Sequence, residues 1–217
     1  MARVKVKICG ITNWRDAKRA AEAGADFLGF NFYPGSPRYI EPAKARKIVR
    51  RLPKGIAVVG VFQNESEHKV RDIARRAGLG YLQLHGDEPP DMVMRLGRSW
   101  RVIKALRVGK SFRPARLGRY KMAAALLLDG FDRHRRGGTG KTFDWKFARQ
   151  AKRYGRIFLA GGLKPENVGE AVRAGKPYAV DVSSGVEAAP GKKDAARMKA
   201  FVQAARGRET RKRKTKP

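Results

Sequence analysis

The chain has 217 residues, 42% of them hydrophobic, which is enough for one sizeable core and makes a single domain the default expectation. A single cysteine excludes an internal disulfide framework, no Cys/His cluster has zinc-ligand spacing, and no stretch approaches the roughly 18 to 20 apolar residues of a membrane span. Lys and Arg number 50 against 19 acids, and the net charge of +31 favours anionic partners, from phosphorylated metabolites to nucleic acids.

Eight short apolar runs that end in Gly, Asp or Asn predict eight β-strands. In chain order they begin at Val4, Ala25, Ala57, Tyr81, Arg101, Ala124, Arg156 and Ala179. Helix-like segments lie between them at residues 13–24, 42–52, 65–78, 144–155 and 164–175. A weaker helical segment covers 111–120, where a proline and a glycine interrupt the pattern.

The ends of these helices carry recognisable signals. Asn13 is expected to cap the first helix, and Gly78 is expected to end the third. Pro42, Pro89 and Pro165 stand where helices should begin, because proline is tolerated in a first helical turn.

A strand followed by a helix eight times is the pattern of a (β/α)₈ barrel, the TIM barrel, in the α/β class. A doubly wound open sheet is the competing fold, but eight full units without a break in composition favour closure. We therefore expect a single catalytic domain over residues 1–206. The remainder, 207–217, is strongly basic and has no apolar residue, so it is expected to be a disordered tail. The N-terminus lacks the apolar run of a signal peptide, and the expected location is the cytoplasm.

Chemistry in such a barrel belongs at the C-terminal ends of the strands. Those positions carry Cys9, Asn31, Gln63, His85 and Asp129 on the first, second, third, fourth and sixth strands. A thiol, an imidazole and a carboxylate at strand ends indicate catalysis. The position of His85 is consistent with a catalytic base, and at least equally with a hydrogen-bond partner that orients another group.

Alternation along the first strand places Lys5, Lys7 and Cys9 on one face, toward the barrel interior. Asp181, on the eighth strand, is positioned to pair with Lys7. A cation beneath a thiol lowers the thiol pKa, so we expect a reactive thiolate at Cys9 near neutral pH. The competing interpretation is that a lone intracellular cysteine is a small buried hydrophobe.

Two glycine-containing loops form a second cue. Gly161 and Gly162 follow the seventh strand, and Ser183, Ser184 and Gly185 follow the eighth. Barrels often bind phosphate through the backbone N–H groups of these two loops, and serine hydroxyls add further donors. The alternative is a pair of ordinary turns.

The segment GGTGKT at 137–142 ends like a Walker A loop. That motif needs a glycine where Arg135 stands, and it should follow a strand directly, whereas the sixth strand ends near Asp129. We interpret the segment as a mobile active-site loop.

The blocks KICGIT, GFNFYPGSPRYI, VGVFQN, QLHGDEP, LLLD, GGTGKTFDW, GGLKPENV and VDVSSGVE occur in this order along the chain. Together they strongly resemble the phosphoribosylanthranilate isomerases of tryptophan biosynthesis. The resemblance implies a (β/α)₈ barrel that performs an Amadori rearrangement of N-(5-phosphoribosyl)anthranilate, a small phosphoribosyl substrate, without metal or organic cofactor.

The resemblance also implies roles for individual residues. Asp129 is similar to the general acid and Cys9 to the general base, with Lys7 and Asp181 in support. Arg38 is similar to the partner of the anthranilate carboxylate, and Gln83 and His85 to further substrate-binding residues. The loops at Gly161–Gly162 and Ser183–Gly185 would hold the ribose phosphate.

Two alternatives stay open. One is another phosphosugar isomerase on the same barrel. The other is a barrel with a polyanion- or nucleic-acid-binding role, because nothing in the family motifs requires a net charge of +31.

Overall fold

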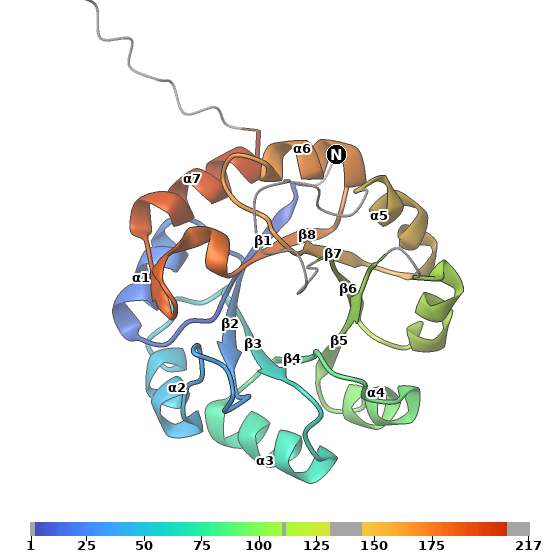
Figure 1. The fold of residues 1–217 in the computed structure, drawn as a ribbon. Coiled ribbons are helices and arrows are strands. Elements are labelled where there is room, and N and C mark those ends of the chain that lie inside the picture. Colours follow the sequence, from blue (N-terminus) through green and yellow to red (C-terminus); the bar gives the residue numbers. More distant parts are fainter. Residues whose placement is uncertain (1–2, 110–111, 131–144, 208–217) are drawn as a thin grey trace, which may run out of the picture.

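A computed structural model describes residues 3–109, 112–130 and 145–207. Within them, eight parallel strands close into a barrel in which each strand pairs with its neighbours in chain order, and β1 pairs with β8 (Figure 1). The strands are β1 Lys5–Cys9, β2 Phe27–Asn31, β3 Ala57–Phe62, β4 Tyr81–Leu84, β5 Arg101–Arg107, β6 Ala125–Asp129, β7 Ile157–Ala160 and β8 Ala179–Val182. The predicted (β/α)₈ barrel is confirmed.

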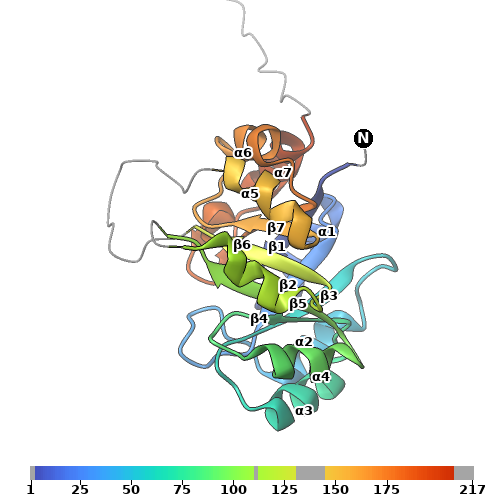
Figure 2. The ribbon, with the colours of Figure 1, turned by 90° about the vertical axis from the view of Figure 1, so that its right-hand side faces the viewer.

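Helices surround the barrel (Figures 1 and 2). They are α1 Trp14–Glu22, α2 Pro42–Val49, α3 Glu67–Ala77, α4 Pro90–Gly97, α5 Lys146–Ala151, α6 Val168–Gly175 and α7 Ala195–Ala205. Three short 3₁₀ segments and a two-stranded hairpin complete the described elements: η1 Pro114–Tyr120, η2 Lys152–Tyr154, η3 Ser184–Val186, β9 Glu187–Ala189 and β10 Lys192–Lys193. None of the helices in the described part is long and apolar enough to cross a membrane.

Most of the predicted helix signals are present. The Asn13 side chain accepts a hydrogen bond from the backbone N–H of Asp16, and Gly78 ends α3 with φ 72°. The weak segment forms the 3₁₀ element η1, because Pro114 and Gly118 disfavour a full α-helix there. Pro165 does not begin a helix: α6 starts three residues later, after a turn in which Asn167 accepts from the Lys164 N–H.

The core has two parts that follow from strand alternation. One set of side chains fills the barrel itself, with the Phe27 ring packed edge-on against Tyr81 and Phe158. The larger set lies between the strands and the helices. Because inward-facing positions are packed with apolar side chains at the lower levels, polar inward-facing residues are left for the C-terminal end of the barrel.

Candidate active site

A cavity of about 640 Å³ opens at the C-terminal end of the barrel. Arg38, His85 and Asp129 all line it, so the structure brings these three predicted residues together. Asn31 and Gln63, two other strand-end residues, line it as well. GGTGKT, interpreted above as an active-site loop, lies outside the described residues.

His85 connects a buried amide to the carboxylate of Asp129. Its Nε2 lies 3.1 Å from Asp129 Oδ2, and its Nδ1 lies 2.9 Å from Gln83 Nε2. Both ring nitrogens of His85 therefore have a polar partner, and which of them donates depends on the His85 tautomer. Gln83 itself is 1% exposed and lies beneath the cavity. The role of Gln83 as a substrate-binding residue stays a prediction, and in the structure its amide contacts His85.

Cys9 lies at the end of β1, directly above a buried ion pair. Lys7 is fully buried, and its Nζ donates to both carboxylate oxygens of Asp181 at 2.9 and 3.0 Å. The two residues face each other in the β1–β8 register, as the alternation predicts. Burial alone would lower the pKa of Lys7, but the Asp181 carboxylate and the Cys9 sulfur outweigh burial and raise it.

The expected low pKa of Cys9 is wrong. Burial raises the pKa of the thiol, and the Lys7 cation, which lowers it, does not fully compensate. Asp181 contributes in the opposite sense to Lys7, because its negative charge disfavours a second anion nearby. The Cys9 pKa therefore lies above its ordinary value of 9.0, and the thiol is the resting form at neutral pH.

Two glycines make room for this arrangement. Gly10, which follows Cys9, has φ 79°, and a Cβ there would stand 2.7 Å from Arg38 Cδ and 3.1 Å from Ser183 Oγ. Gly29 is the neighbour of Cys9 across the β1–β2 pairing. A Cβ at Gly29 would stand 2.8 Å from Cys9 Sγ and 3.1 Å from Lys7 Nζ. The role of Gly29 could not be predicted from the sequence, because a glycine inside a strand usually only weakens the strand.

Arg38 is held by a carboxylate that the sequence analysis also missed. Its Nε and one terminal nitrogen donate to Glu187 at 2.8 and 2.7 Å, in a two-point ion pair. Glu187 begins β9, directly after η3. An acid a few residues before the two lysines of β10 was the available signal in the sequence. Whether these residues form an ion pair depends on the path of the loop between them.

The loops after β7 and β8 pack against each other. A Cβ at Gly185 would stand 2.0 Å from the carbonyl oxygen of Leu163, so a side chain there is excluded. Gly161 and Gly162 both have positive φ, 88° and 65°. The Ser183 hydroxyl is buried and has no hydrogen-bond partner among the described residues. An unpartnered buried hydroxyl is costly, which makes this position suited to an external acceptor such as a phosphate oxygen.

A further buried lysine lies outside the predicted site. Lys104 is 1% exposed and donates to Glu88 at 3.0 Å and to the Gly86 carbonyl at 2.7 Å. The pair fixes the loop that follows His85. In the described part of the chain, no group of three or more His, Cys, Asp or Glu side chains is placed to hold a metal ion.

Comparisons with known proteins agree on one family. The family described as "N-(5'phosphoribosyl)anthranilate (PRA) isomerase" matches residues 6–204. The N-(5'-phosphoribosyl)anthranilate isomerase of Geobacter sulfurreducens is 52% identical over 204 residues, covering 94% of this chain and 99% of the relative. A crystal structure of the Thermotoga maritima enzyme superposes with a TM-score of 0.87 at 45% identity, covering 94% and 99% of the two chains. Another phosphoribosyl anthranilate isomerase, solved in complex with reduced 1-(o-carboxyphenylamino)-1-deoxyribulose 5-phosphate, gives 0.85 at 43% identity, with the same coverage.

Proposed function

The chain belongs to the N-(5'-phosphoribosyl)anthranilate isomerase family, and from that premise we propose how its own residues carry the reaction. The protein is an isomerase of tryptophan biosynthesis that converts N-(5-phosphoribosyl)anthranilate to 1-(2-carboxyphenylamino)-1-deoxyribulose 5-phosphate. One observation supports the assignment of roles more than any other. Arg38, His85 and Asp129 line a single cavity. Cys9 lies at the end of β1, above the Lys7–Asp181 pair.

Asp129 is the general acid of the first step. It donates a proton to the ring oxygen of the ribose, the C1′–O bond breaks, and the lone pair of the anthranilate nitrogen forms a protonated C1′=N Schiff base. His85 Nε2, 3.1 Å from Asp129 Oδ2, holds the carboxyl group in place and is positioned to exchange a proton with it.

Cys9 is the general base of the second step. In its thiolate form, the minor form at neutral pH, Cys9 takes the proton from C2′. The electron pair of that C–H bond forms a C1′=C2′ double bond as the nitrogen becomes neutral. The enolamine then loses its 2′-hydroxyl proton and gains a proton at C1′, which leaves a ketone at C2′. One carbon is oxidised and its neighbour is reduced, so the reaction balances without a co-reactant.

The two anionic ends of the substrate have separate binding groups. Arg38 binds the anthranilate carboxylate, because a guanidinium offers two parallel hydrogen bonds. Gly161, Gly162 and Ser183 to Gly185 bind the ribose phosphate through backbone N–H groups and hydroxyls. The buried, unpartnered Ser183 hydroxyl supports this assignment. The cytoplasmic location stays a prediction.

The experiment that tests the proposal is incubation of the protein with freshly prepared phosphoribosylanthranilate, followed by loss of anthranilate fluorescence. Arg38→Met is the informative variant, since it should raise KM. Because it also removes an ion-pair partner of the buried Glu187, its melting temperature is measured to show that it folds. An isomerase of a different sugar phosphate would ignore the anthranilate carboxylate. Equal KM values for the wild type and Arg38→Met with phosphoribosylanthranilate would contradict the proposed contact between Arg38 and the anthranilate carboxylate.

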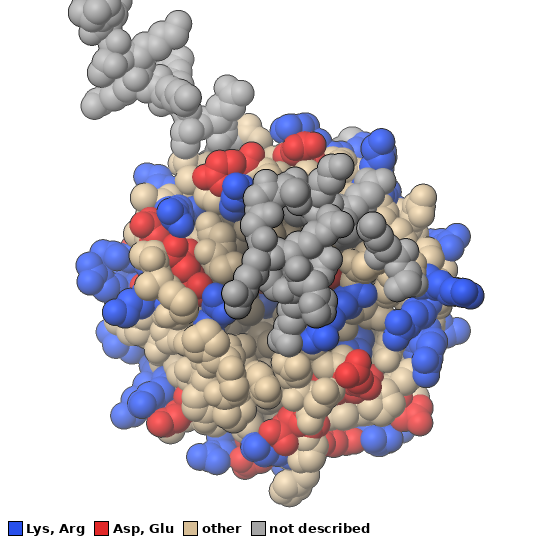
Figure 3. Space-filling view, in the orientation of Figure 1, with Lys and Arg blue, Asp and Glu red and all other residues tan. Residues whose placement is uncertain are grey.

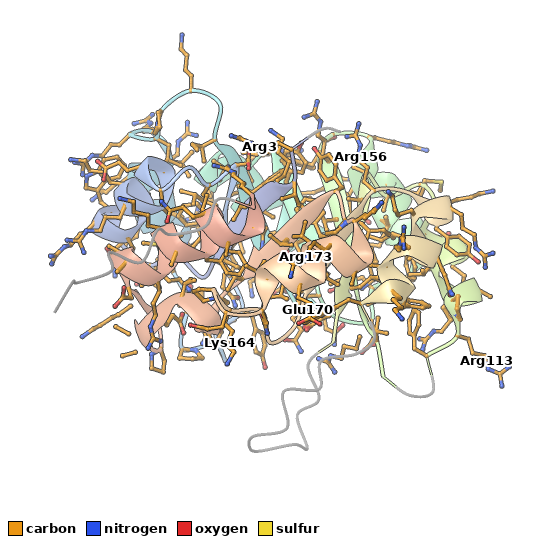
Figure 4. All side chains as sticks on the ribbon, turned by 90° about the horizontal axis from the view of Figure 1, so that it is seen from above. Arg3, Arg113, Arg156, Lys164, Glu170 and Arg173 are labelled. Carbon is orange, nitrogen blue, oxygen red and sulfur yellow. The ribbon has the colours of Figure 1, made fainter. Side chains whose placement is uncertain are left out.

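A second candidate function, polyanion binding, rests on the distribution of charge. Residues 92–128 hold ten bases and no acid, and 145–165 hold six bases and no acid. These stretches meet in space, because the Phe112 and Phe147 rings pack 5.7 Å apart beside η1 and α5. Figure 3 shows Lys and Arg side chains along the right-hand edge, mainly below the place where Figure 1 labels α5. Arg113 extends away from the body (Figure 4).

We propose that the face formed by these two stretches binds the phosphodiester backbone of nucleic acid without sequence preference. On the other side of the barrel, bases such as Lys18, Lys69 and Arg76 pair with acids four residues away in the chain. Reversal of Arg113, Arg119 and Arg149 to Glu should therefore weaken binding of a single-stranded oligonucleotide and flatten its salt dependence. The same charge change at Lys18, Lys44 and Lys69 is the matched control. Equal losses in both triple variants would mean that only net charge matters.

A further inference from the structure

Glu187 is the acceptor for an unusually dense set of donors. Its Oε1 accepts from Arg38 Nε and from Lys193 Nζ, both at 2.8 Å, and its Oε2 accepts from a terminal nitrogen of Arg38 at 2.7 Å. The backbone N–H of Gly191 adds a contact at 3.3 Å. Glu187 is 7% exposed, and although burial acts to raise its pKa, hydrogen bonds from Arg38 and Lys193 hold the pKa below its ordinary range. The carboxylate is therefore ionised at neutral pH.

The two-point contact decides which edge of the Arg38 guanidinium remains available. Glu187 takes the edge formed by Nε and one terminal nitrogen. The edge formed by the two terminal nitrogens has no acceptor among the described contacts, and a guanidinium can bind a second carboxylate there in parallel. Arg38 lines the cavity and Glu187 does not, so Glu187 holds the guanidinium from its protein side.

Lys193 extends the same contacts to the loop after β8. Its side chain is fully buried, and Nζ donates to Glu187 at 2.8 Å and to the Ser183 carbonyl at 3.2 Å. Its backbone N–H donates to Asp16, in the first turn of α1. Glu187 and Lys193 thus connect Arg38 to Ser183. Arg38 and Ser183 also lie on either side of Gly10.

We propose that Glu187 and Lys193 are positioning residues that set the direction of the Arg38 guanidinium and its spacing from the phosphate-binding loop. The inference rests on the proposed roles of Arg38 and Ser183. In this arrangement Glu187 acts at the carboxylate end of the substrate and Lys193 at the phosphate end. If the Glu187–Lys193 ion pair served stability alone, loss of either residue would not affect one end of the substrate more than the other.

The test uses two stable ligands that differ in one group. One is reduced 1-(2-carboxyphenylamino)-1-deoxyribulose 5-phosphate, and the other is the same compound without the carboxyl group. Glu187→Gln keeps the side-chain shape but removes the charge that directs Arg38. We expect it to weaken the carboxylated ligand about 10- to 100-fold, the value of an oriented charge-assisted hydrogen-bond pair. Binding of the ligand that lacks the carboxyl group should stay within about threefold, since most of its contacts lie elsewhere.

Lys193→Met tests the other end of the network. It should raise the Kd of both ligands by a similar factor. Inorganic phosphate should also compete less well for the site. Glu187→Asp keeps the charge and should restore part of the discrimination between the two ligands. It also serves as the informative variant if Glu187→Gln does not fold, which melting temperatures will show.

Glu67→Gln is the matched control. Glu67, on α3, also accepts from two arginines, Arg71 and Arg95, at 2.7 Å each, and does not line the cavity. Its variant should leave both Kd values unchanged. If the wild type does not distinguish the two ligands, the proposed role of Arg38 fails. If the wild type distinguishes them and Glu187→Gln does so equally well, the positioning role alone is overturned.

Discussion

Lys7 and Asp181 face each other across the pairing of the first and last barrel strands, with the Lys7 ammonium 2.9 and 3.0 Å from the two carboxylate oxygens. The pair lies directly below Cys9, and Lys7 affects Cys9 as well as Asp181. The cation therefore has two tasks, which are to neutralise a buried carboxylate and to limit the cost of ionising the thiol.

Lys7→Met should fail at both tasks. Loss of one partner of a buried pair leaves an uncompensated charge and costs about 3 to 5 kcal/mol of unfolding free energy. The Cys9 pKa should also rise further, because the cation that lowers it is gone. Urea unfolding and the pH dependence of Cys9 alkylation measure the two effects. Lys18→Met is the control, since Lys18 and Glu22 form an exposed pair 3.8 Å apart worth well under about 1 kcal/mol.

The pH dependence of Cys9 itself is a direct prediction. Because the thiol pKa is raised, the reactive thiolate should increase through and above pH 9, the ordinary value, and not below it. Cys9 is the only cysteine, so the rate of iodoacetamide alkylation against pH reports on this thiol alone. The urea-unfolded chain provides the reference midpoint. A folded midpoint below that of the unfolded chain would contradict the dominance of burial.

Cys9→Ser and Asp129→Asn should each reduce kcat by roughly 10²- to 10⁴-fold, the usual contribution of a general base or acid. A serine hydroxyl is a far weaker acid than a thiol, and an amide has no proton to donate. Both variants should still bind the reduced product analogue, because neither residue belongs to the proposed binding groups at its two ends. Near-normal turnover in either variant would disprove the role of the residue it replaces.

Gly29→Ala should impair catalysis through crowding. The added methyl group would stand 2.8 Å from the Cys9 sulfur and 3.1 Å from the Lys7 ammonium, so one of these groups must move. We expect a lower kcat together with a changed Cys9 alkylation profile. Gly97→Ala, at the end of α4, is the matched control, because nothing lies within 4 Å of the added carbon. An unchanged profile in Gly29→Ala would show that Cys9 does not depend on this space.

The sequence predicts the barrel and the positions at its strand ends because both depend on local periodicity. Alternation in β1 and β8 was sufficient to pair Lys7 with Asp181, since strands in register leave little freedom. Glu187 and Lys193 were missed because they lie in the β9–β10 hairpin, whose path depends on long-range contacts such as Lys193 with Asp16. No local pattern encodes such a path.

The Cys9 pKa was mispredicted for a different reason. The sequence shows that a cation lies near the thiol, but the sign of the shift depends on the balance between that cation and the loss of water around the sulfur. Burial is a property of the closed barrel. Two effects that shift the Cys9 pKa in opposite directions cannot be ordered from neighbours along one strand.

The ion pair beneath Cys9 also imposes an order of events on synthesis of the protein. Lys7 leaves the ribosome 174 residues before Asp181, an interval of roughly 9 to 35 s at ordinary elongation rates. Throughout that time the nascent chain carries a lysine and a nucleophilic thiol that have no buried partner, and no partial barrel can supply one. The Cys9 thiol therefore reaches its final environment, above the Lys7–Asp181 pair, only when the eighth strand has been made.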